Sequence, residues 1–140
     1  MTRIEFLTEH QAAVALAEAW NRLDPSELID LMADDVHYCS QRVLEELTTK
    51  KAVAEYLQER MRLTAIDVAT KPYVKVFAEL GNSAGNSQEC DCVVIAQGTL
   101  ENIVAIIFLK VEGSRIKRID LCVPQFQEVI RSGVYPGGTE

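Results

Sequence analysis

Four cysteines and two histidines are the residues of this 140-residue chain that most directly suggest metal or nucleophile chemistry. One residue separates Cys90 from Cys92, whereas zinc ligands usually have two to four residues between them. His37 lies near Cys39, but the sequence places no serine or cysteine nucleophile within reach of either imidazole. We therefore expect free, partly buried thiols, with no metal, no disulfide and no cofactor.

Composition narrows the classes of function further. The chain has 14 basic and 21 acidic residues, and its formal charge of −7 would repel nucleic acid. The longest apolar run, Ile103–Leu109, is too short to span a bilayer, so no membrane partner is expected. Residues Met1–Glu5 have no apolar stretch behind their one basic residue, which predicts no signal peptide and a cytoplasmic location.

The first half of the chain has helical periodicity. Thr8-Glu9-His10-Gln11 has the form of a capping box, and the apolar residues that follow it recur on one stripe of a helix. Asp24-Pro25-Ser26-Glu27 predicts the start of a short second helix that runs to about Ala33. A third helix is predicted over Lys50–Leu63, with the segment Val36–Ser40 extended before it.

The second half changes from a period of about 3.6 to a period of 2, which indicates strands. The predicted strands are Tyr73–Leu80, Cys90–Gln97, Leu100–Val111 and Ile116–Val123. Residues 81–87 are predicted to form a loop, and residues 112–114 a tight turn. We therefore predict one α+β domain over residues 1–140. Three N-terminal helices should pack on a strongly curved, mainly antiparallel sheet and close a conical pocket.

Three short motifs carry a family resemblance. Ala19-Trp20-Asn21 leading to Asp24, then residues 31–36, then residues 50–53, resemble nuclear-transport-factor-2-like proteins, including SnoaL-like cyclases and ketosteroid isomerases. The resemblance covers nearly the whole chain and implies the cone-shaped, cystatin-like α+β fold. Members of this superfamily have many activities, so the resemblance implies a fold and not an activity.

The ketosteroid isomerases offer a direct comparison, since they use an aspartate base and an oxyanion hole made of a tyrosine and a protonated aspartate. Aligned with them, this chain has Ser40 at the base position and Leu16 and Ile107 at the oxyanion positions. None of these side chains can take the corresponding role, so steroid isomerisation is not expected.

The same alignment implies the ligand-binding candidates. Tyr38 and Ser40 would point inward from the first strand. Trp20 and Tyr56 are candidates to stack on a ligand. For each of the three aromatic residues, a place in the core is the commoner outcome. These four residues are our predicted ligand contacts, and the catalytic residues stay unassigned.

Charged residues supply two further candidates. Arg118 and Asp120 share one strand face and resemble the pair of the superfamily's epoxide-hydrolase branch, but the alignment turns them to the outer face, where an ion pair contributes little. Arg42, Glu45 and Glu46 would border the mouth of the pocket, where charged residues are usually only solvated.

The predicted function is that of a homodimeric domain that binds a small apolar molecule. Alternatives are a SnoaL-like isomerase, cyclase or hydrolase and a protein-interaction module, so whether the chain is an enzyme stays open. The homodimer is predicted to form through the outer sheet face, where Val104, Ile106 and Phe108 would otherwise lie exposed. The alternative is a monomer in which residues 125–135 cover them.

Overall fold

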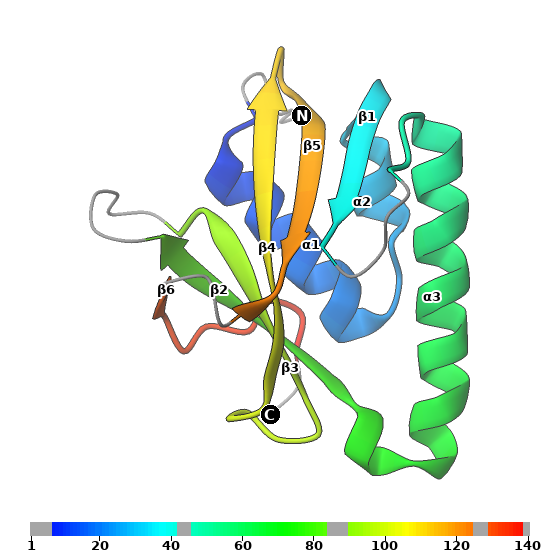
Figure 1. Ribbon diagram of the computed structural model, residues 1–140, viewed down its shortest axis with the longest axis vertical. Helices are drawn as coiled ribbons and strands as arrows, with labels where there is room; N and C mark the ends of the chain where they lie inside the picture. Colours follow the sequence, from blue (N-terminus) through cyan, green and yellow to red (C-terminus); the bar gives the residue numbers. More distant parts are fainter. Residues whose placement is uncertain (1–6, 42–45, 84–89, 125–128, 139–140) are drawn as a thin grey trace, which may run out of the picture.

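Three helices and a six-stranded curved sheet form the α+β fold of this chain (Figure 1). The computed structural model describes residues 7–41, 46–83, 90–124 and 129–138. The strands are β1 (Met32–Ser40), β2 (Val76–Ser83), β3 (Cys92–Gln97), β4 (Ile103–Glu112), β5 (Arg115–Cys122) and β6 (Val129–Arg131). Their order is β1-β5-β4-β3-β2-β6. β1 runs parallel to β5, and all other neighbours are antiparallel.

The helices begin where the sequence predicts and end elsewhere. Helix α1 (Glu9–Arg22) starts at the complete capping box of Thr8 and Gln11. Helix α2 (Ser26–Asp30) ends three residues before the predicted Ala33, because β1 already begins at Met32. Helix α3 (Lys50–Thr70) continues seven residues beyond Leu63. No helix in the described ranges is long and apolar enough to cross a membrane.

Pro72 accounts for the difference at the end of α3. No proline or glycine lies between Leu63 and Pro72, so no breaker ends the helix earlier. The 3₁₀ turn η1 (Pro72–Val74) then delays β2 to Val76, whereas the sequence pattern predicted a strand from Tyr73.

The far end of β2 also differs from the prediction. Strand β2 continues to Ser83, through positions predicted as loop, because residues 81–83 pair with β6. The rest of the predicted loop, residues 84–87, lies outside the described residues. The period-2 pattern did not reveal β6, which has only three residues.

The core lies between the helices and the inner face of the sheet. Helix α1 packs across β2, β3 and β4, whereas α3 stands against β1 (Figure 1). Ala105, Ile107 and Leu109 of β4 point inward, as the alternation predicted. The prediction was wrong at the start of the strand, because a register shift pairs Ile103 with Ala96 of the outer face and leaves Val104 packed against the core.

The outer face of the sheet is more covered than the sequence suggested. Ile106 is only 4% exposed and Val94 is buried as well, while Phe108 is half-buried. Val129 of β6 lies against this face, because a Cβ added at Gly81 would meet Val129 Cγ1 at 2.7 Å and Val94 Cγ2 at 3.0 Å. Ile106 is therefore covered within one chain and needs no partner to bury it, contrary to the reason given for a homodimer. Residues 125–128 of the segment considered as its cover lie outside the described residues.

Candidate functional site

A cavity of about 730 Å³ lies at the edge of β2, and we call it the β2-edge cavity. Four segments line it: Asn21 at the end of α1, residues 75–77 at the start of β2, residues 98–100 after β3, and residues 133–138 after β6. Small-molecule sites commonly have volumes of about 300–1,000 Å³. The cavity is therefore large enough for a metabolite-sized ligand.

Asn21 connects two walls of this cavity through its carboxamide. Its Nδ2 donates to the carbonyl oxygens of Ala78 and Pro136, each at 2.8 Å. Its Oδ1 accepts the N–H of Ala78, also at 2.8 Å. The side chain therefore pairs with β2 as a neighbouring strand would, and it also holds the segment after β6.

A buried carboxylate holds the same segment from the other side. Glu79 is 3% exposed, and its oxygens accept hydrogen bonds from Arg131 Nε and the N–H of Gly133, each at 2.6 Å. The hydrogen bond to Glu79 raises the pKa of Arg131. Burial and the charge of Glu79 raise the pKa of Tyr135. Glu79 thus fixes the wall that carries Gly133 and Tyr135.

The cavity lining has an apolar and a polar part. Val76, Phe77 and Leu100 supply apolar surface, and Lys75 and Tyr135 supply a cation and a hydroxyl. The Lys75 ammonium also lies 5.3 Å from the centre of the Phe77 ring, within cation–π range. Such a lining can hold a molecule with an apolar body and an acidic or hydrogen-bonding group.

Gly98 shapes the turn that closes one side of the cavity. Its φ is +84°, and an added Cβ would lie 2.6 Å from the carbonyl oxygen of Tyr73. Only glycine tolerates both conditions, so this turn can approach η1 closely.

Solved structures with the same arrangement of helices and sheet identify the fold. An NTF2-like protein of unknown function from Cytophaga hutchinsonii superposes with a TM-score of 0.56 at 8% identity, covering 90% of this chain and 96% of that one. A SnoaL-like protein of unknown function from Burkholderia thailandensis gives 0.53 at 16% identity, covering 89% and 94%. A candidate polyketide cyclase from Xanthomonas campestris gives 0.51 at 16% identity, covering 85% and 95%. The chain has the NTF2-like fold. No family model and no curated protein sequence matches it.

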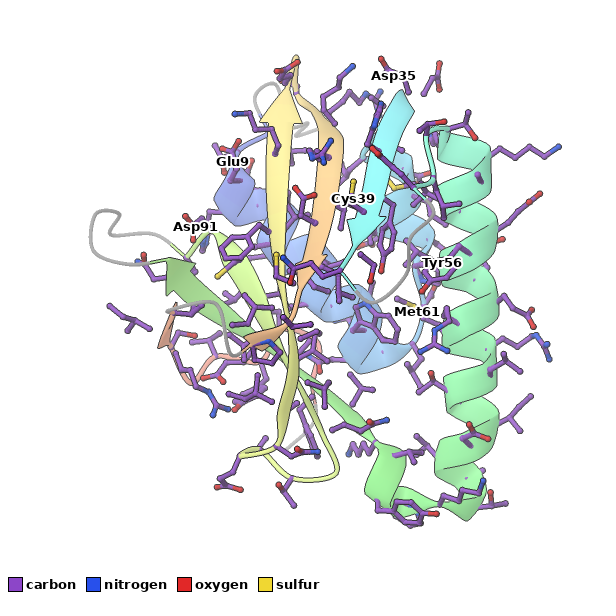
Figure 2. All side chains as sticks on the ribbon, in the orientation of Figure 1. Glu9, Asp35, Cys39, Tyr56, Met61 and Asp91 are labelled. Atoms are coloured by element: carbon purple, nitrogen blue, oxygen red, sulfur yellow. The ribbon has the colours of Figure 1, made fainter. Side chains whose placement is uncertain are left out.

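Between the helices and the sheet of this NTF2-like fold, the described side chains form a packed hydrophobic core. Leu16, Leu57 and Met61 are each 1% exposed. Figure 2 shows Tyr56 and Met61 on the side of α3 that faces the sheet. Tyr38 is buried, and its ring centre lies 5.2 Å from that of Tyr56. Two of the four predicted ligand contacts therefore meet in a packed core.

The chemistry of Tyr38 follows from that packing. Burial raises the pKa of its hydroxyl, and the neighbouring Tyr56 raises it further, while Arg60 partly opposes the shift. The hydroxyl stays protonated at neutral pH and can donate a hydrogen bond, but it cannot act as a base.

The other two predicted contacts have different surroundings. Trp20 is half-buried against the core near the end of α1. Ser40 lines a hollow of about 490 Å³ that also touches Cys39, Asp120 and Cys122, which we call the outer-sheet hollow. The described lining of the β2-edge cavity includes none of the four.

Arg118 and Asp120 lie on the outer face, as predicted. Arg118 Nε bonds Asp120 at 3.1 Å, and Arg118 also approaches Glu46 at 3.6 Å and Cys39 Sγ at 3.0 Å. Glu46 accepts a short hydrogen bond from His37, which lowers the pKa of the Glu46 carboxyl. These charges are largely exposed and contribute little to stability. Arg42 and Glu45 lie outside the described residues.

The four thiols are all free. Burial is the main cause that raises the pKa of Cys39 to about 11 and that of Cys92 to about 12. Both side chains are therefore neutral thiols at physiological pH and weak nucleophiles.

The residues that build the cavity were not predicted as site residues. Asn21 belongs to one of the motifs that carry the family resemblance, but its hydrogen-bond partner Ala78 is 57 positions away, so the contact could not be inferred from the sequence. Glu79 gave one usable signal, because it is the one charged residue within the otherwise apolar run Val76–Leu80. A contact with Arg131, 52 positions later, could not be inferred from it.

Proposed function

We propose that this chain is a binding domain for a small, largely apolar molecule with one acidic or hydrogen-bonding group, held in the β2-edge cavity. The observation that carries the proposal is a cavity of about 730 Å³ beside an interior that the chain's own side chains fill. The ligand therefore sits at the edge of β2 rather than at the centre of the predicted cone.

The charges near the cavity favour an acidic ligand group. Lys75 is an exposed cation on its lining, and the nearby carboxylate of Glu79 is already paired with Arg131. Val76, Phe77 and Leu100 offer the surface that an apolar body would cover.

Binding without catalysis fits the lining better than a SnoaL-like isomerase, cyclase or hydrolase. Such an enzyme needs an acid or base beside its substrate. The described lining residues of the β2-edge cavity include no carboxylate and no imidazole side chain. A filled interior alone would favour the interaction-module alternative, but the β2-edge cavity supplies a separate place for a ligand.

The test uses 8-anilinonaphthalene-1-sulfonate, an aromatic probe with one anionic group. Leu100→Trp should place an indole in the cavity and weaken probe binding at least about tenfold, measured by fluorescence titration. Leu63→Trp is the matched control, since Leu63 and Leu100 are 42% and 41% exposed and Leu63 lies on α3. Equal binding by wild type and Leu100→Trp would remove the β2-edge cavity as the site.

Pairing of two copies through the outer sheet face is a second part of the proposal. Because Ile106 and Val94 are covered within one chain, the interface would centre on the half-buried Phe108 and the outer-sheet hollow beside it. Phe108→Asp should then give monomers by light scattering. A wild-type chain that is monomeric at micromolar concentration would exclude this interface.

A further inference from the structure

The edge of β2 that faces away from β3 makes a regular series of hydrogen bonds through its backbone. The N–H of Leu80 donates to the carbonyl of Val134 at 2.9 Å, and the carbonyl of Leu80 accepts the N–H of Ser132 at 3.2 Å. Two residues earlier, the Asn21 carboxamide supplies both partners of Ala78. The peptide groups of alternate residues thus point to this edge, and each pair is satisfied.

Val76 is the next residue in that series. By the same alternation its N–H and C=O point to the edge. The Lys75 carbonyl before it points the other way and accepts the N–H of Gly98 at 2.8 Å, and Phe77 after it is paired with Ala96 of β3. Among the described residues, neither edge-facing group of Val76 has a hydrogen-bond partner. Val76 also lines the β2-edge cavity.

The chain after β6 leaves β2 at this point. Pro136 is held by Asn21, and the N–H of Gly138 turns back to the carbonyl of Tyr135 at 2.9 Å. The place beside Val76 that a continuing strand would occupy is therefore part of the cavity. The N–H and the C=O of Val76 face this place, as the N–H and C=O of one strand residue face a neighbouring strand.

We infer that the β2-edge cavity binds a secondary amide in its extended form, with a carboxylate nearby, the chemistry of an N-acylated amino acid and of a peptide C-terminus. The ligand N–H donates to the Val76 carbonyl, and a carboxylate oxygen of the same ligand residue accepts the Val76 N–H, as the N–H and C=O of one residue in an added strand would pair. The acyl carbonyl of the ligand points away from β2. Lys75 lies on the same lining and attracts the carboxylate. This inference rests on the proposed function and specifies its ligand class.

Paired ligands test the amide directly in the wild-type protein. N-acetylphenylalanine has the N–H, the carbonyl and the carboxylate, whereas N-acetyl-N-methylphenylalanine lacks the N–H and 3-phenylpropanoate lacks the amide. We expect calorimetry to show about tenfold weaker binding for each of the latter two. Ala-Ala-Phe distinguishes a peptide terminus from an acylated amino acid. If N-acetylphenylalanine or Ala-Ala-Phe binds, and binding weakens when its amide N–H is methylated, the proposed ligand class is supported. If neither compound binds, the ligand class is overturned.

A backbone variant tests the protein side. Val76→Pro removes the edge-facing N–H without breaking a bond to β3, and proline is tolerated on strand edges. Lys75 already has a φ of −59° and a ψ of 138°, an extended conformation of the kind required before proline. Val76→Ala keeps the N–H and is the control. We expect Val76→Pro to bind N-acetylphenylalanine about tenfold more weakly and Val76→Ala to bind it like wild type.

The anilinonaphthalene probe separates the two proposals, because it carries no secondary amide. Retained probe binding by Val76→Pro together with lost N-acetylphenylalanine binding supports the amide site. Unchanged N-acetylphenylalanine binding by Val76→Pro overturns the amide site and leaves the cavity intact as a binding place. If Val76→Pro does not fold, the comparison of methylated and unmethylated ligands on wild type decides alone.

Discussion

Replacing Asn21 should destabilise the chain far more than its half-buried position suggests. Asn21→Ala removes three side-chain hydrogen bonds, two to Ala78 and one to Pro136, each 2.8 Å long. A partly buried hydrogen bond contributes about 1 kcal/mol net, so the free energy of unfolding should fall by about 2–3 kcal/mol. That is a large share of the roughly 5–15 kcal/mol of a typical domain.

Asn21→Asp adds a pH dependence that separates this mechanism from a simple loss of packing. One oxygen of the new carboxyl can still accept the Ala78 N–H. The other oxygen faces the carbonyl oxygens of Ala78 and Pro136, to which it can donate a hydrogen bond only when the carboxyl is protonated. Its folded pKa should therefore lie above its unfolded value of about 3.9. The variant's stability relative to wild type is then highest below about pH 4 and falls as the pH rises through the folded pKa.

Urea denaturation at pH 4 and pH 7 of wild type and the two Asn21 variants measures both effects. Asn102→Asp is the control, since the Asn102 amide makes one exposed bond to the Gln97 carbonyl and should matter little. Two results would refute the role assigned to the Asn21 hydrogen bonds: an Asn21→Ala variant as stable as wild type, or a loss of stability in Asn21→Asp that does not change with pH.

Two further predictions concern buried groups. Glu79→Gln should lower the free energy of unfolding by about 2 kcal/mol in urea, because it removes the buried charge that pairs with Arg131 and turns an NH2 group toward one of the two donors, Arg131 Nε or the Gly133 N–H. Glu59→Gln, which breaks an exposed pair, should cause no measurable change, and equal effects would contradict the reasoning. Cys39 and Cys92 should resist iodoacetamide in the folded chain at pH 8 and react faster as the pH approaches 11, because only the thiolate reacts; peptide mapping that finds either one rapidly alkylated at pH 8 would contradict their raised pKa.

The fold could be predicted largely because its signals are local. The capping box of Thr8 needs only residues three apart, and the change of hydrophobic period marks the passage from helices to strands. The alternation along β4 assigned Ala105, Ile107 and Leu109 correctly, but it failed at Ile103 and Val104, where a register shift breaks the period. Errors arose where no local residue sets the boundary, as at the end of α3, where the chain stays helical until it nears Pro72.

The site could not be predicted in the same way, because it depends on contacts between distant segments. Strand β6 is too short to show a period, yet it extends β2 and helps to cover Val94. The family alignment directed attention to Tyr38 and Tyr56, which pack against each other in the interior. The cavity instead forms where the chain after β6 separates from β2, and no pattern of residue types marks that position.

The parallel pairing of β1 with β5 has a consequence for how the chain is made. Asp35 of β1 and Lys117 of β5 form an ion pair across 82 positions, whereas β2, β3 and β4 pair with one another without β1. On the ribosome, β1 and the apolar side of α3 emerge long before β5, so this side of the nascent chain stays incomplete until β5 has been made. We expect a translating chain stalled before β5 to need chaperone protection, whereas the meander from β2 to β4 can already pair on its own.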